Sequence, residues 1–212
     1  DLEKFAASAG DARMKVAGLQ ELEDSKHIGE LGARLQELVT SPKDRLIVYV
    51  SAHGVSEAGV PYVLCSNYAR SHTEEDTIKA RRELPKLLED VGRCQAEVKL
   101  VLLDCSHLTG EPRLGMAVNE FGRLIEGQVK QPQTWVLVAN RPLEVSRVSY
   151  AAKRSYFAHY VLEALQGGAD ADGDGCVDLR ESFQFVRDGV STAVKQEAGK
   201  DESQTPVLYH GG

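Results

Sequence analysis

Two apolar stretches, residues 46–52 and 98–104, place the strongest limits on what this chain can fold into. Each is rich in Val, Leu and Ile, and each has the length of one strand. Apolar runs with little polar alternation are typical of strands that are buried on both faces of a parallel sheet. Each run therefore predicts one buried strand of a mainly parallel sheet that is covered by helices on both faces.

Reactive side chains stand where both runs end. His53 and Gly54 follow the first run, and Asp104, Cys105 and Ser106 close the second. Active sites of open α/β sheets lie at the carboxyl ends of the strands. A thiolate is a strong nucleophile, and a nearby imidazole both lowers the thiol pKa and protonates the leaving amine. We expect His53 to act as base and acid, Cys105 as nucleophile and the Gly54 N–H as an oxyanion donor.

The rest of the chain alternates between strand-like and helix-like patterns. The further expected strands cover residues 14–19, 60–65, 134–140 and 206–209, and the expected helices cover 25–39, 77–91, 116–126, 149–166 and 179–196. Alternating elements of this kind predict an α/β fold with a mainly parallel sheet. A chain of 212 residues is long enough for one domain with a sizeable core.

The chain resembles the caspase-like cysteine peptidases (clan CD, peptidase C14 or metacaspase type), and in particular those of bacteria. The resemblance is carried by YVSAHG at residues 49–54, by a cysteine roughly 50 residues later, by residues 139–165 and by QTP at 204–206. It implies a caspase-like three-layer α/β/α sandwich, one domain over residues 1–212, and a peptide or protein ligand. The family's first strand is not evident before Met14, so it is either missing or supplied upstream.

The chain departs from this family at the nucleophile. The common family pattern is Asp-x-Cys, whereas here Ser106 stands two residues after Asp104 and Cys105 stands one residue after it. Side chains alternate between the two faces of a strand, so a shift of one residue turns a group to the other face. If the strand is regular, Ser106 faces His53 and Cys105 points away; if it bulges at Asp104, Cys105 can enter the site.

These alternatives lead to different functions. An active Cys105 implies a cysteine endopeptidase, and Asp104 as the pocket acid implies cleavage after Arg or Lys, as in metacaspase-like relatives. A displaced Cys105 implies a pseudopeptidase that binds a peptide or partner. A Ser106/His53 hydrolase would need an acid to orient the imidazole, and no acid stands near His53 in the sequence. A further alternative is a structural module, and His107 is expected at the rim of the site.

An acidic segment at residues 170–181 follows the twelve-residue calcium loop of EF-hands. Gly175 stands where this loop makes its sharp turn, and helical patterns flank the segment. The expected ligands are the carboxylates of Asp170, Asp172, Asp174, Asp178 and Glu181 and the main-chain carbonyl of Cys176. Sensor EF-hands occur in pairs, so a single loop predicts a structural calcium ion. The alternative is a solvated turn without an ion.

The composition limits the classes of partner and the cellular compartment that we expect. The net charge of −7, without a cluster of Lys and Arg, argues against nucleic acid, and no apolar run reaches the roughly 20 residues of a membrane span. Four cysteines without CxxC spacing favour free thiols in a reducing, cytoplasmic compartment. The chain starts at Asp1 without a methionine, so we expect an excised segment whose targeting information lies elsewhere. The sequence does not indicate an oligomeric state.

Overall fold

The computed structural model describes residues 29–68, 73–106, 110–111, 116–117 and 120–211, and these fall into two compact units. One unit contains Val138–Val207. The other contains residues 29–137 and 208–211 within these limits. The strand expected at residues 14–19 and the rim residue His107 lie outside the described residues.

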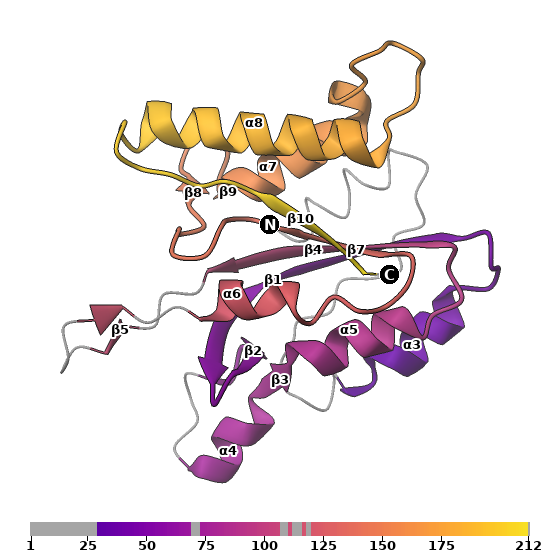
Figure 1. Ribbon diagram of the computed structural model, residues 1–212, viewed down its shortest axis with the longest axis vertical. Coiled ribbons are helices and arrows are strands. Elements are labelled where there is room, and N and C mark those ends of the chain that lie inside the picture. The colour runs from indigo at the N-terminus through magenta and orange to yellow at the C-terminus, as the bar shows by residue number, and fades with distance from the viewer. Residues whose placement is uncertain (1–28, 69–72, 107–109, 112–115, 118–119, 212) are drawn as a thin grey trace. The chain divides into compact units, whose positions relative to one another are not determined.

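A six-stranded sheet in the order β10-β7-β4-β1-β2-β3 runs through the larger unit (Figure 1). Its bounds are β1 Arg45–Glu57, β2 Val60–Leu64, β3 Arg81–Glu83, β4 Val98–Ser106, β7 Thr134–Val138 and β10 Val207–Gly211. The two apolar runs form β1 and β4, which pair in parallel, whereas β1–β2 and β2–β3 pair antiparallel. The two strands that were expected to be buried therefore lie inside the sheet, and a β1–β2–β3 meander extends the sheet to one edge.

The described residues of this larger unit form four helices: α3 Leu31–Leu38, α4 Glu74–Lys79, α5 Leu84–Gly92 and α6 Phe121–Glu126. Helix α5 shows why these segments pack as they do, because its buried residues recur at helical spacing. They are Leu84, Leu87, Leu88 and Val91. Helix α3 lies beside α5, and α6 packs against β2 and β1. Two short strands, β5 Gly110–Glu111 and β6 Met116–Ala117, pair with each other.

Three expected helices differ in the structure. Residues 77–91 do not form one helix, because β3 pairs with β2 and separates α4 from α5. Pro85 stands in the first turn of α5, where its missing N–H costs no hydrogen bond. The helix expected over residues 116–126 is restricted to α6, with β6 before it. The helix expected over residues 149–166 begins only at Tyr156, and a short hairpin precedes it.

The smaller unit consists of that hairpin, β8 Val148–Ser149 and β9 Arg154–Ser155, followed by α7 Tyr156–Glu163 and a π-helical turn, Ala164–Gly168. Helix α8, Leu179–Glu197, then packs along α7 (Figure 1). The side chain of Ser155 caps α7, and Asp178 with Glu181 forms a capping box at α8. Among the described helices, none combines the length and the apolarity that a membrane span requires.

Candidate functional site

His53 lies at the end of the parallel pairing between β1 and β4, whereas the sequence predicts it at the end of the strand. The strand itself does not end there, because β1 continues to Glu57 and pairs its last residues with β2. The register matches Ser51 with Asp104, Ala52 with Cys105, and His53 with Ser106. The His53 side chain is exposed to solvent.

Cys105 is fully buried, with an exposed fraction of 0%. It shares the register position of Ala52, and Ala52 points to the opposite face of β1 from His53 because side chains alternate along a strand. Burial raises the pKa of the Cys105 thiol well above its ordinary value, and the charge of Asp104 raises it further, against a smaller opposing effect of a backbone hydrogen bond at Ala52. The thiol is therefore held in its protonated form.

Strand β4 remains regular through residue 106, so no bulge shifts Cys105 toward the face of His53. Ser106 instead holds the register position that is paired with His53. Of the residues that the sequence brings forward as candidates, the structure thus places His53 and Asp104 on one face of the two strands, and Ser106 takes the backbone register position beside His53. The structure places Cys105 on the other face.

Asp104 is buried, with an exposed fraction of 6%, and its carboxylate accepts a hydrogen bond of 2.8 Å from the hydroxyl of Tyr49. Tyr49 was not among the expected site residues. The sequence nevertheless indicates that Tyr49 lies on the same face of the strand as His53. Tyr49, Ser51 and His53 are spaced two residues apart along β1, and residues at this spacing share a face. The carboxylate that was expected to bind a basic substrate residue therefore already has a partner within the sheet.

Gly54 is buried in β1 and is paired with Val63 of β2. A Cβ atom added at this position would lie 2.8 Å from ring atoms of Phe121. Phe121, the first residue of α6, is itself almost fully buried. The absence of a side chain at residue 54 thus allows the α6 aromatic ring to pack against the strand, which gives this glycine a structural reason that sequence analysis did not identify.

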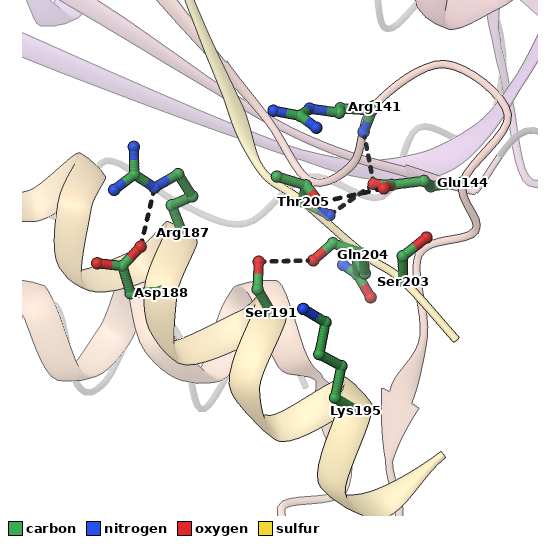
Figure 2. A pocket seen from close by; sticks show the side chains of 9 residues that line it. All are labelled: Arg141, Glu144, Arg187, Asp188, Ser191, Lys195, Ser203, Gln204 and Thr205. Carbon is green, nitrogen blue, oxygen red and sulfur yellow. Dashed lines mark hydrogen bonds and ion pairs between the residues drawn. The ribbon is translucent and has the colours of Figure 1, made fainter. Parts of the chain in front are cut away.

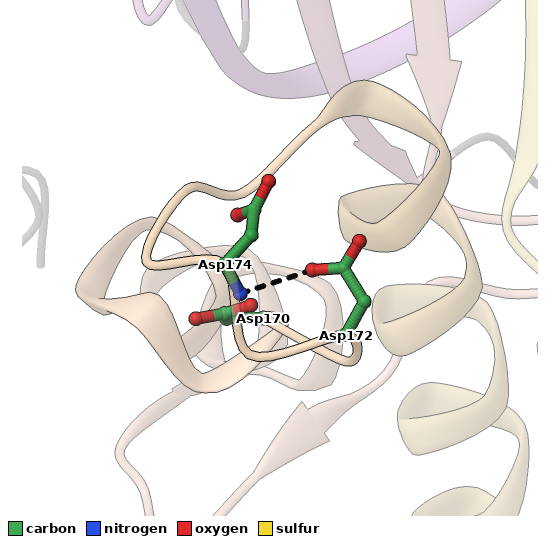
Figure 3. A group of neighbouring side chains, drawn as sticks. All are labelled: Asp170, Asp172 and Asp174. Atoms are coloured by element: carbon green, nitrogen blue, oxygen red, sulfur yellow. Dashed lines mark hydrogen bonds between the residues drawn. The ribbon is translucent and has the colours of Figure 1, made fainter.

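The acidic loop links the π-helical turn to α8 (Figure 3). The carboxylates of Asp170, Asp172 and Asp174 offer oxygen atoms that all lie within 4.8 Å of one another. The Asp170 carboxylate also accepts hydrogen bonds from the N–H groups of Gly173 (2.8 Å) and Gly175 (3.0 Å). Gly175 has a φ of 82°, the left-handed conformation for which glycine is suited at a sharp turn.

The other expected calcium ligands lie outside this cluster of three carboxylates. Glu181 accepts hydrogen bonds from the N–H groups of Ala171 (3.0 Å) and Asp178 (2.9 Å). Asp178 in turn accepts from the Glu181 N–H at 2.8 Å, so both carboxylates cap α8. The Cys176 N–H donates to Asp174 at 2.7 Å. Three of the six expected ligands are therefore gathered together. The role of all six in metal binding stays a prediction.

All four cysteines are free thiols. Cys65, Cys94 and Cys105 are buried, and Cys176 is exposed. Free thiols agree with the sequence-based expectation, and the reducing compartment inferred from them stays a prediction.

The sheet and its helices define an α/β fold of the caspase-like class, as the sequence predicts. Among solved structures, the chain is similar to the crystal structure of caspase-1 from Spodoptera frugiperda, with a TM-score of 0.58 and 13% identity. The match covers 98% of this chain and 77% of that one. No family model and no curated protein sequence matches the chain. At this identity the likeness shows the fold, and the chemistry has to be argued from the residues of this chain.

Proposed function

We propose that this chain is a caspase-fold domain that does not cleave peptide bonds through Cys105 and acts as a binding domain for a peptide or protein. The observation that supports this is the register of β4, which pairs Ser106 with His53 and leaves Cys105 buried beside Ala52. Cysteine peptidases need a thiolate in contact with an imidazole. Cys105 does not form this arrangement with His53, because its pKa is raised and it lies on the other face of the strand pair from His53.

A serine hydrolase is less well supported. A Ser–His pair needs a carboxylate that holds the imidazole in the right orientation and stabilises its charge. In the part of the chain that the structure describes, His53 forms no ion pair or hydrogen bond with a carboxylate. Asp104 lies on the same face as His53, but its carboxylate accepts a hydrogen bond from the Tyr49 hydroxyl. Ser51 and His53 remain exposed, and these polar side chains are available to contact a ligand.

Alkylation of the four thiols tests the catalytic part of the proposal. Iodoacetamide labelling should be followed at each cysteine by mass spectrometry across pH, with exposed Cys176 as the internal reference. We expect Cys105 to react at least about 100-fold more slowly than Cys176, because each unit of pKa elevation removes tenfold of the thiolate. Labelling of Cys105 that is faster than that of Cys176 and is lost in His53→Ala would instead establish an active dyad.

A gain-of-function variant tests the position of residue 106. Ser106→Cys puts a thiol at the register position paired with His53. We expect this thiol to be labelled at a pH below the range of a free thiol, and we expect His53→Ala to abolish that reactivity. The matched control is Cys105→Ser, which makes the reverse exchange at the neighbouring residue. It should leave the labelling rates of the other thiols unchanged. An inert thiol at residue 106 would contradict the inferred register.

The binding role has its own test. A peptide library should be selected against the wild-type chain and against Cys105→Ala, and the two should retain the same peptides with similar affinity. Peptide hydrolysis that is lost in Cys105→Ala would refute the proposal in favour of the endopeptidase. If both chains retain no peptide, the binding role itself fails.

We also propose that the loop at residues 170–181 binds a structural calcium ion. Calcium prefers several oxygen ligands, and the gathered carboxylates of Asp170, Asp172 and Asp174 supply them. Three like charges at this spacing repel one another, and a divalent cation would offset that repulsion. Glu181 would join as a ligand only after releasing the N–H groups of Ala171 and Asp178. The ion would supply charge neutralisation and fix the start of α8.

Thermal unfolding with calcium tests this site. At a calcium concentration ten times Kd, mass action contributes about 1.4 kcal/mol. That contribution corresponds to a rise in Tm of roughly 3–6 °C for a chain of this size. We expect Asp170→Ala with Asp172→Ala to abolish the rise. The matched control, Glu37→Ala with Asp201→Ala, removes two exposed acids elsewhere and should retain it. No rise at millimolar calcium in the wild-type chain would exclude the site.

A further inference from the structure

A cavity of about 510 Å³ lies beside α8 in the smaller unit (Figure 2). Its walls come from three segments: the loop after β7, one face of α8, and the segment that leads into β10. Volumes of this size are typical of sites for small molecules. None of the residues in these walls was predicted from the sequence as a site residue, although Gln204 and Thr205 belong to the closing QTP motif.

The lining carries an excess of positive charge. Three cations, Arg141, Arg187 and Lys195, stand against two carboxylates, Glu144 and Asp188. Arg187 and Lys195 are eight residues apart on α8, so they lie near the same face of the helix, and Arg141 comes from the loop (Figure 2). This excess is notable in a chain whose net charge is −7.

Both carboxylates are already engaged. The Glu144 carboxylate accepts hydrogen bonds from the main-chain N–H groups of Arg141 (3.1 Å) and Thr205 (2.6 Å) and from the Thr205 hydroxyl (3.1 Å). Asp188 accepts from the Nε of Arg187 at 2.9 Å. Within the described ranges of the chain, by contrast, neither the Arg141 guanidinium nor the Lys195 ammonium forms an ion pair. Two cationic side chains are therefore available to a ligand.

The walls are fixed by hydrogen bonds that are buried or partly buried. Gln204 is fully buried, with an exposed fraction of 0%. Its amide donates to the carbonyl of Ala139 at 3.0 Å and accepts from the Arg147 N–H at 2.9 Å. The hydroxyl of Ser191 on α8 donates to the main-chain carbonyl of Gln204 at 3.1 Å. These bonds tie the loop, α8 and the segment before β10 together, so the cavity is preorganised for a ligand.

We propose that this cavity binds a small phosphate-bearing molecule with at least two negative charges. The guanidinium of Arg141 presents N–H groups in a fork that matches two phosphate oxygens, and Lys195 adds a point charge. A ligand with two charges satisfies both unpaired cations. The cavity is larger than one phosphate group needs, which leaves room for the rest of a metabolite.

Titration calorimetry with inorganic pyrophosphate tests the proposal. Ionic strength should be held constant with chloride, because screening alone changes weak anion binding. We expect the wild-type chain to bind, and Arg141→Gln with Lys195→Gln to bind at least tenfold more weakly. The control, Lys43→Gln with Lys200→Gln, also removes two positive charges, but from exposed positions elsewhere. It should bind pyrophosphate like the wild type. Equal loss in both pairs, or no binding by the wild-type chain, would overturn the site.

The class of ligand is tested with a second anion and a conservative variant. Citrate carries several carboxylates and should bind at least tenfold more weakly than pyrophosphate. Arg141→Lys keeps the charge but removes the fork, and we expect it to weaken pyrophosphate binding several-fold. Citrate that binds as tightly as pyrophosphate would overturn the assignment to phosphate. An unchanged affinity in Arg141→Lys would overturn the role given to the guanidinium.

Discussion

The buried thiol of Cys105 predicts how the stability of this protein depends on pH. The folded state raises the pKa of Cys105, mainly by burial, whereas the unfolded chain has an ordinary thiol with a pKa of about 8.5. Below that value both states hold the proton, and the contribution of Cys105 to stability is complete. Above it only the unfolded state loses the proton. Stability is therefore lost as the pH rises toward the folded pKa.

The loss can be calculated from the linkage relation. Each pH unit above the unfolded pKa removes about 1.4 kcal/mol from the free energy of unfolding, so Cys105 accounts for about 2 kcal/mol between about pH 7.5 and about pH 10. The folded state also raises the pKa values of Tyr156, Tyr160 and Tyr209, each mainly through burial. These hydroxyls act in the same direction, but only above about pH 10, where free tyrosine ionises.

Urea unfolding under reducing conditions measures this effect. The free energy of unfolding should be determined across the pH range for the wild-type chain, for Cys105→Ala and, as a control, for Cys176→Ala, which removes an exposed thiol. Cys105→Ala lowers stability at neutral pH because it leaves a small cavity. We expect its deficit relative to the wild type to shrink by about 2 kcal/mol by about pH 10. Cys176→Ala should follow the wild type throughout.

A thiolate–imidazolium dyad requires the opposite sign. Contact with a charged His53 would depress the folded pKa of Cys105 below that of the unfolded chain. The contribution of Cys105 would then be present above the unfolded pKa and lost as the pH falls through the folded pKa. A deficit of Cys105→Ala that grows between about pH 6 and about pH 8.5, or that does not change with pH, would refute the reasoning given for a buried, silent thiol.

Two other substitutions test the packing described above. Gly54→Ala introduces a Cβ at 2.8 Å from the Phe121 ring, so we expect a loss of about 1–3 kcal/mol in urea unfolding, and Phe121→Leu in the same chain should recover part of it. Strictly additive effects of the two changes would argue against this contact. Gln204→Ala leaves the Ala139 carbonyl and the Arg147 N–H without a buried partner, which should cost about 2–4 kcal/mol. The adjacent exposed change, Ser203→Ala, should cost little; similar losses for both would contradict the role of Gln204.

Local sequence patterns were sufficient for the central elements of the fold. Local patterns predict the strands β1 and β4 from their apolar runs and the helix α8 from its helical spacing. These predictions need no information from distant residues. The acidic loop is also local, because the spacing of its aspartates and glycines specifies its turn. The sequence failed where pairing is non-local. Residues 81–83 have a helical pattern around them, yet hydrogen bonds to β2 make them a strand.

At the candidate site, the sequence by itself determined that Asp104 and Ser106 share one face and Cys105 takes the other if the strand is regular, because side chains alternate, and it left open a bulge at Asp104. Only the tertiary structure decided which face belongs to His53. That choice depends on the register between two strands far apart in the chain, on the continuation of β4 through residue 106, and on the packing that buries Cys105. Alternation is a property of one strand, whereas register and burial are set by the contacts of the whole sheet.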